Sequence, residues 1–241
     1  MLKQRFPTAF DLRERAKQRM PNFAFEFMDG GAGADGGIKR NWAALDAIEL
    51  VPRYGNLIRP PLADTKLFGH AYAAPFGISP IGGAGTALPG AETYLARVAQ
   101  AARIPYTMSV LSGISIERAA ELAPDVLWFQ LIRFGQNDHQ IGFDLVSRAE
   151  AAGVQVLVLT CDTPVLTTRP RQAKSGIMDP FRLTMRLRMD ALSSPGWLLS
   201  LARNGMPNFA PLEPYLEGAK NLASAASFIR QAGGGTFTWD E

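Results

Sequence analysis

The middle of the chain alternates short apolar runs with longer segments that mix alanine, leucine and charged residues. Each apolar run is too short for a helix of ordinary length, whereas the mixed segments have the length and the caps of helices. Strands that alternate with helices form a parallel sheet with right-handed connections. The pattern therefore predicts an α/β fold. The predicted strands are 76–79, 106–109, 126–131 and 154–159, and the predicted helices are 89–103, 115–122 and 137–152.

The last predicted strand leads into a polar, turn-prone stretch. Gly153 is a good C-cap for the helix before it, and the apolar run 154–159 changes abruptly to Thr160, Asp162 and the residues after them. In a (β/α)8 barrel the chemistry lies at this carboxyl end of the strands. The segment 160–169 is therefore a candidate functional loop. The same stretch also fits one strand of any other α/β protein, and the pattern alone leaves both possibilities open.

The first thirty residues carry weaker patterns. Thr8 with Asp11 three residues later resembles a capping box and predicts a helix that begins here. Phe23, Phe25 and Phe27 alternate as in a strand, while Phe23 and Phe27 alone also fit one face of a helix. Either element is compatible with this stretch.

A glycine-rich run follows. Residues 31–36, GAGADG, fit the dinucleotide pattern G-x-G-x-x-G. That pattern has a phosphate-binding role only where it follows a strand and opens a helix within a βαβ unit. No clean strand precedes it here, so the sequence favours a flexible loop over a dinucleotide site.

After Arg169 the alternation of strands and helices stops. Residues 175–235 interleave arginines with Met, Leu and Trp, which suits either a helix at a membrane surface or an excursion packed on the protein itself or on another subunit. Four strands cannot close a barrel, and an open parallel sheet leaves an exposed edge. We therefore expect a fragment, or a chain that needs another chain, divided into 1–74 (N-terminal helices and entry segment), 75–174 (four strands) and 175–241 (excursion, a long loop after the fourth strand).

Composition narrows the class of protein. With 47% hydrophobic and 20% charged residues the 241-residue chain has the composition of a soluble globular protein. Its net charge of +3 and scattered arginines do not indicate a nucleic-acid partner. A single cysteine, Cys161, excludes an intrachain disulfide and suits the cytoplasm. The isolated His70 and His139 do not predict a metal site, and neither a signal peptide nor a membrane span is apparent.

Five motifs together resemble one family. FEFMDGGAGAD, SPIGG, TMSVLS, WFQL and LTCDTPVLTTR follow one another along essentially the whole chain. In this order the chain resembles the N-terminal part of the FMN-dependent α-hydroxy acid dehydrogenases and oxidases, the family of glycolate oxidase, L-lactate dehydrogenase and mandelate dehydrogenase. The resemblance implies a (β/α)8 TIM barrel with FMN at the carboxyl ends of its strands, and the oxidation of a 2-hydroxy acid to the 2-oxo acid.

The resemblance also implies a set of cofactor-binding residues. The segment Pro80-Ile81-Gly82 matches the loop after the first strand, whose backbone lies against the flavin ring. Ser109 matches a hydrogen-bonding residue at the end of the second strand. Gln130, in WFQL, matches the amide that binds the polar pyrimidine edge, which needs a donor and an acceptor together. Thr160 matches a hydroxyl beside the ring. Without the family pattern, Ser109 and Thr160 are ordinary turn residues at strand ends.

Three positions are implied to bind the substrate. Arg169 matches the arginine that holds the substrate carboxylate, for which a planar guanidinium is well suited. The alternative is an ordinary surface arginine, since Arg171 lies two residues away. Phe27 and Ile132 stand where the family usually has tyrosines. The two missing hydroxyls predict apolar walls that favour aryl or long-chain 2-hydroxy acids over glycolate and lactate.

The family's catalytic histidine base, its lysine beside the flavin and its second substrate arginine match no residue of this chain. We therefore expect the chain alone to be inactive, and the complete enzyme to be a cytoplasmic homo-oligomer, with contact to the inner membrane through 175–235 left open. The electron acceptor, whether oxygen, a quinone or a cytochrome, is not predicted. Two alternatives are a non-catalytic half-barrel, which binds a partner chain or is a degraded reading frame, and a non-flavin barrel enzyme that acts on phosphorylated substrates.

Overall fold

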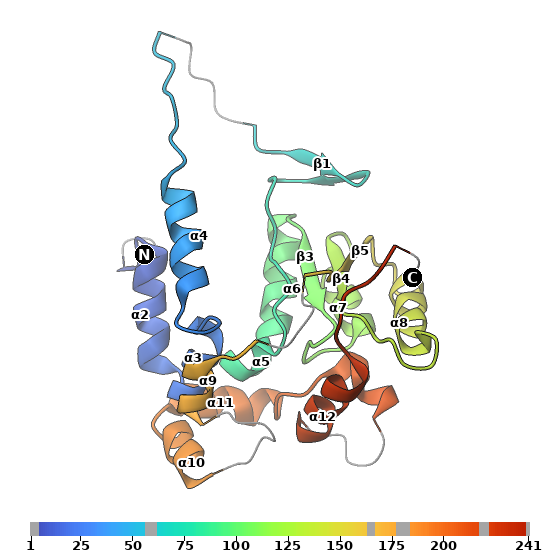
Figure 1. Ribbon diagram of the computed structural model, residues 1–241. Helices are drawn as coiled ribbons and strands as arrows, with labels where there is room; N and C mark the ends of the chain where they lie inside the picture. The colour runs from blue at the N-terminus through green and yellow to red at the C-terminus, as the bar shows by residue number, and fades with distance from the viewer. Residues whose placement is uncertain (1–4, 56–61, 163–166, 177–183, 217–221, 240–241) are drawn as a thin grey trace.

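A parallel sheet forms the centre of the computed structural model, which describes residues 5–55, 62–162, 167–176, 184–216 and 222–239 (Figure 1). Its strands are β3 (Tyr106–Ser109), β4 (Leu127–Leu131) and β5 (Val156–Leu159), paired in the order β3-β4-β5. Ile78 adds a single parallel bridge to Tyr106 on the other side of β3. The four segments thus lie side by side in chain order, as successive strands of an open, partial barrel.

Helices lie between the strands in sequence. They are α5 (Ala84–Ala87), α6 (Ala91–Ala102), α7 (Ile116–Leu122) and α8 (Gln140–Ala151). Two of them, α6 and α7, contact β3 and β4 directly. The hydroxyl of Ser115 accepts a hydrogen bond from the backbone N–H of Arg118 and caps α7, as predicted. The helix predicted to begin at Pro89 begins instead after Gly90, whose φ of 84° only glycine adopts readily.

The main core lies between the sheet and these helices. Met108, Phe129 and Leu145 are fully buried there, together with the alanines of α6 and α7. The strand predicted over 76–79 is reduced to the bridge at Ile78, whose N–H donates to the carbonyl of Pro105 over 2.8 Å and whose carbonyl accepts from the N–H of Thr107 over 2.9 Å. On the other side, β5 has no further strand paired to it in the described part of the chain, and Leu157 and Leu159 are 41% and 46% exposed.

Three helices precede the sheet: α2 (Ala9–Arg19), α3 (Asn22–Asp29) and α4 (Gly36–Asp46). The capping box of Thr8 and Asp11 is present. The phenylalanine-rich stretch is helical, which decides between the two elements that its pattern allowed. The glycine run is an ordered turn between α3 and α4. A helix rather than a strand precedes it, so a dinucleotide-binding role is excluded. A hairpin of β1 (Thr65–Leu67) and β2 (His70–Tyr72) follows.

The excursion after β5 is helical rather than a long loop. Its elements are α9 (Pro170–Ser175), α10 (Met185–Leu192), α11 (Pro195–Asn204), the 3-10 helix η1 (Ala210–Tyr215) and α12 (Leu222–Ala232). Leu187 and Trp197 pack with Phe23 and Ala24 in a second core. Figure 1 shows α9, α10 and α11 on the same side of the molecule as α3. None of the helices in the described ranges is long and apolar enough to cross a membrane.

Candidate functional site

Three side chains form a continuous hydrogen-bonded row across the carboxyl ends of β3, β4 and the residue after β5. The Ser109 hydroxyl donates to Gln130 Oε1 over 2.9 Å, and Gln130 Nε2 donates to the hydroxyl oxygen of Thr160 over 2.6 Å. Ser109 and Gln130 are buried, and Thr160 is half-buried. The structure therefore brings together three of the residues that the sequence indicates as cofactor-binding.

The row follows from the register of the sheet. Ser109 pairs with Gln130 across β3 and β4, and the backbone N–H of Thr160 donates to the carbonyl of Leu131. A carboxamide has two donor hydrogens and two acceptor lone pairs, and the row uses one donor hydrogen and one lone pair of Gln130. The remaining donor and acceptor suit the edge of a heteroaromatic ring that carries both kinds of group.

The segment 80–82 lies next to this row. Pro80 is exposed, whereas Ile81 and Gly82 are half-buried. A Cβ at Gly82 would lie 3.3 Å from Leu111 Cδ1, and the N–H of Gly83 donates to the carbonyl of Leu111 over 2.9 Å. The loop after Ile78 is thus packed against the residues that follow Ser109. Small side chains permit this approach and leave the backbone of the loop accessible.

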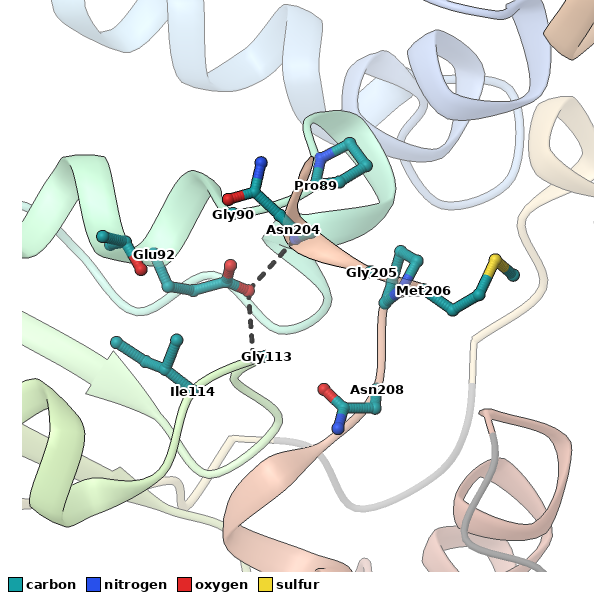
Figure 2. A pocket seen from close by; sticks show the side chains of 12 residues that line it. Pro89, Gly90, Glu92, Gly113, Ile114, Asn204, Gly205, Met206 and Asn208 are labelled. Carbon is teal, nitrogen blue, oxygen red and sulfur yellow. Dashed lines mark hydrogen bonds between the residues drawn. The ribbon is translucent and has the colours of Figure 1, made fainter. Parts of the chain in front are cut away.

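A buried glutamate that sequence reasoning missed holds the same two loops together. Glu92, at the start of α6, is only 3% exposed, and its Oε1 accepts hydrogen bonds from the backbone N–H groups of Gly85 and Gly113, each over 3.1 Å. Figure 2 shows it beside a cavity of about 90 Å³ that Asn204 and Asn208 of the excursion also line. An acidic residue in the first turn of a helix is ordinary, so the sequence carries no signal that this one is buried.

The three residues predicted to bind the substrate lie on different segments of the fold. Phe27, on α3, places its ring beside the loop after Ile78, where Cζ lies 3.3 Å from the position of a Cβ on Gly83. Ile132 follows β4, and its Cδ1 lies 3.2 Å from the position of a Cβ on Gly233, beyond α12. Arg169 stands directly before α9 and is exposed. Residues 163–166 of the motif between Thr160 and Arg169 lie outside the described residues.

Arg169 and its neighbour Arg171 have opposite environments. Arg171 is ion-paired to Glu26, Asp29 and Asp35, whose carboxylates raise its pKa, the hydrogen bond to Glu26 first among them. The side chain of Arg169 has no hydrogen bond or ion pair with any other described residue. The arginine with a structural role is therefore Arg171, and Arg169 keeps its guanidinium available for a ligand.

Carboxylates around Arg171 are held in the charged form. The Arg13 guanidinium lowers the pKa of Asp29, with a further hydrogen bond from Arg171. The backbone N–H of Gly31 lowers the pKa of Asp35, again with help from Arg171.

The two histidines lie elsewhere: His70 in β2 and His139 directly before α8. Within the described ranges, no three His, Cys, Asp or Glu side chains gather as metal ligands would.

Known proteins resemble the chain over most of its length. A model of the family described as FMN-dependent dehydrogenase matches residues 16–241. The L-lactate dehydrogenase of Pseudomonas syringae pv. syringae (strain B728a) is 32% identical over 235 residues, which are 97% of this chain and 61% of that protein. The L-lactate dehydrogenase of Yersinia pestis (strain Pestoides F) is 35% identical over 198 residues, which are 82% of this chain and 51% of that protein.

Solved structures of related proteins also match the chain over most of its length. A structure titled as the monotopic membrane protein (S)-mandelate dehydrogenase superposes with a TM-score of 0.86 at 27% identity, covering 96% of this chain and 61% of that one. A mandelate oxidase with (S)-4-hydroxymandelic acid gives a TM-score of 0.73 at 25% identity, covering 98% of this chain and 59% of that one. The chain thus spans between half and two thirds of the length of each of these four proteins.

Proposed function

The chain belongs to the family of FMN-dependent dehydrogenases, and we propose that it supplies the flavin-ring side of an enzyme that oxidises a 2-hydroxy acid to the 2-oxo acid. The observation that carries this proposal is the row Ser109–Gln130–Thr160 at the carboxyl ends of three adjacent parallel strands. In barrel enzymes this end of the strands is where ligands bind.

The residues of the row fit a flavin ring. FMN, when bound, accepts a hydride equivalent from the substrate, and the protein supplies orientation and charge. Gln130 keeps a free N–H and a free lone pair for the pyrimidine edge. The segment 80–82 contains Gly82, which packs against Leu111, two residues after Ser109. Thr160 has a hydroxyl hydrogen that the row does not use.

Arg169 is proposed to bind the substrate carboxylate, because its guanidinium is exposed and unpaired among the described residues. Phe27 and Ile132 are proposed as apolar walls, which favour an aryl or long-chain acid.

The chain holds no match for the family's histidine base, so we propose that it does not turn over substrate alone. Purified chain with FMN, a 2-hydroxy acid and a dye acceptor is expected to show no rate above free flavin, and a clear substrate-dependent rate would contradict this.

FMN binding tests the proposal directly. We expect weak, saturable quenching of FMN fluorescence by the purified chain, because the residues of the proposed site would contact only the ring of FMN and not its phosphate. Gln130→Leu should abolish the quenching, whereas Gln140→Leu, an exposed glutamine on α8, should leave it unchanged. Equal quenching by both variants would overturn the assignment of the row. Tight, stoichiometric quenching by the unaltered chain would show a more complete cofactor site than we propose.

A second candidate function is that of a non-catalytic half-barrel which binds a partner chain. The open side of β5, with Leu157 and Leu159 partly exposed, favours it, because strands of parallel sheets are normally buried on both faces. Light scattering of the purified chain separates the two functions. A stable complex with another polypeptide, in the absence of any FMN binding, would support the half-barrel and contradict the flavin role.

Contact with a membrane surface is a further part of the proposal. Met185, Met189 and Leu192 of α10 are 68%, 62% and 63% exposed, and their spacing places them on one face of the helix. Arg186 and Arg188 adjoin them, which is the composition of a helix at a membrane interface. A solved relative is titled a monotopic membrane protein.

Liposome co-sedimentation tests this contact. Serine at Met185, Met189 and Leu192 together should lower binding to anionic vesicles. The matched control replaces three exposed apolar residues of α6 and α8, namely Tyr94, Val98 and Phe143. If both triple variants bind as the unaltered chain does, α10 has no role at the membrane.

A further inference from the structure

The glycine-rich turn between α3 and α4 has the dinucleotide pattern but contacts an arginine from a distant part of the chain. Arg171 Nε donates to Glu26 Oε2 over 2.6 Å, Nη2 to Asp29 Oδ2 over 2.7 Å, and Nη1 to Asp35 Oδ2 over 3.0 Å. Nη1 also lies 3.3 Å from the carbonyl oxygen of Asp29. All three nitrogens of the guanidinium are therefore used, by two residues of α3 and one of the turn.

The glycines of the turn make this contact possible. A Cβ at Gly30 would lie 2.7 Å from the carbonyl oxygen of Glu26, which excludes a side chain there, and 3.3 Å from Arg171 Cβ, so Arg171 packs against the bare backbone of Gly30. Asp35 has a φ of 61° and accepts a hydrogen bond from the N–H of Gly31 over 2.8 Å, which directs its other carboxylate oxygen to Arg171. The turn 30–35, together with Glu26 and Asp29 of α3, thus forms a binding site for one side chain, which we call the socket.

A second bond joins the same turn to the residue before Arg169. The N–H of Gly33, at a φ of 57°, donates to the carbonyl of Thr168 over 2.9 Å. Arg169 therefore lies between two fixed points, the backbone of Thr168 and the side chain of Arg171. Its own side chain is exposed and unpaired among the described residues. The helix that supplies Glu26 and Asp29 also carries Phe27.

We propose that the socket, formed by Glu26, Asp29 and the turn 30–35, holds Arg171 so that Arg169 is presented to the substrate carboxylate. Arg171 is then a positioning residue. This inference rests on the proposed function, in which Arg169 binds that carboxylate. The three carboxylates also neutralise Arg171 and occupy its donors. A substrate anion consequently meets one available guanidinium rather than two, which fixes where its carboxylate binds.

The geometry distinguishes arginine from lysine at this position. A guanidinium reaches three carboxylates at once because its nitrogens are arranged in a rigid plane, whereas an ammonium group acts as a single point charge. Arg171→Lys should therefore restore only part of what Arg171→Gln loses. Arg13 also pairs with Asp29, from the exposed side of α2. Arg13→Gln is the matched control, because it removes an arginine from the same carboxylate without touching Glu26 or Asp35.

The experiment uses NMR of the whole chain with two readouts. One is hydrogen exchange of the Gly33 amide, and the other is the shift of the Arg169 Nε–H signal during titration with (S)-mandelate. Arg171→Gln is expected to speed exchange and to weaken mandelate binding, each by about tenfold or more, since charge-assisted bonds are lost. Arg171→Lys should lie between, and Arg13→Gln should change mandelate binding less than about twofold.

The outcomes separate this inference from the proposed function. If mandelate does not shift the Arg169 signal in the unaltered chain, the proposed substrate role fails and the positioning role fails with it. If mandelate binds and Arg171→Gln binds it equally well, only the positioning role is overturned. Should Arg171→Gln not fold, Asp35→Asn removes one of the three charges while its amide oxygen can still accept from Gly31. Unchanged mandelate affinity in Asp35→Asn would then overturn the socket.

Discussion

The proposed flavin-facing and substrate-facing sides of the candidate site are held in place by different means. Ser109, Gln130 and Thr160 lie at the ends of adjacent strands and bond to one another, so the sheet itself fixes their spacing. Arg169 and Phe27 lie outside the sheet, on segments joined by a cluster of ions and backbone bonds. Ser109, Gln130 and Thr160 therefore contribute to the fold as well as to the proposed site, whereas the exposed side chain of Arg169 is proposed to serve the site alone.

The largest expected effect comes from breaking the row on the flavin-facing side. Gln130→Leu leaves the Ser109 hydroxyl without its acceptor and Thr160 without its donor, in a region where Gln130 is 7% exposed. We expect the free energy of unfolding to fall by about 2–3 kcal/mol, measured by urea denaturation. Arg169→Leu should change it by less than about 0.5 kcal/mol, as for an exposed side chain. Equal losses would remove the distinction between the two sides.

The origin of these two sides also explains what the sequence could predict. The strands come from short apolar runs, and parallel strands bring their carboxyl ends to one edge, so the pattern places Ser109, Gln130 and Thr160 near one another. Their selection as cofactor-binding residues comes from the family resemblance. The socket depends on contacts between residues 136 to 145 positions apart, such as Glu26 and Arg171. No local pattern carries that information, and Gly31 and Gly33 of the same turn also fit a dinucleotide motif.

Two other differences between the sequence-based prediction and the structure have a similar cause. The phenylalanines of α3 allow a strand or a helix, and the structure has a helix in which Phe23, Ala24 and Phe25 are all buried by tertiary contacts. Glu92 has the sequence signal of an exposed residue, and only the approach of two loops buries it. Tertiary packing, which the sequence pattern does not contain, determines both.

The next effect concerns the link between the two loops beside the row. Glu92→Ala leaves the N–H groups of Gly85 and Gly113 without an acceptor, and we expect a loss of about 2 kcal/mol in the free energy of unfolding. Glu92→Gln keeps a carbonyl oxygen at the same position and should cost less than half as much. Thermal denaturation of both variants measures this. A glutamine as damaging as alanine would show that the charge, rather than the acceptor, is what the loops require.

Substrate choice in the complete enzyme tests the apolar walls. A polar substrate group against Phe27 or Ile132 would lose water without gaining a partner, at a cost of about 1–3 kcal/mol. We therefore expect kcat/KM to favour aryl over small 2-hydroxy acids. Phe27→Tyr with Ile132→Tyr should move the preference toward lactate and glycolate. A preference for glycolate in the unaltered enzyme would show that these residues do not line the pocket.

The smallest expected effect is the pH dependence of the ion cluster. The pKa values of Asp29 and Asp35 are lower in the folded chain than in the unfolded one. Each carboxylate therefore contributes stability that is fully present above the unfolded pKa of about 3.9 and is lost as the pH falls through the folded pKa. The destabilisation caused by Arg13→Gln should be present at neutral pH and shrink in acid. Chemical denaturation at several pH values measures it, and a constant difference would contradict the assignment.

The contrast between the two sides is tested most directly by measuring two ligands on two variants. FMN fluorescence and mandelate titration by NMR are recorded for Gln130→Leu and Arg169→Leu beside the unaltered chain. We predict that Gln130→Leu, in the fraction that remains folded, loses FMN binding and keeps the mandelate-induced shift of Arg169. Arg169→Leu should lose mandelate binding and keep FMN binding. If either variant loses both ligands while folded, or neither loses its own, the division of the site into these two sides is wrong.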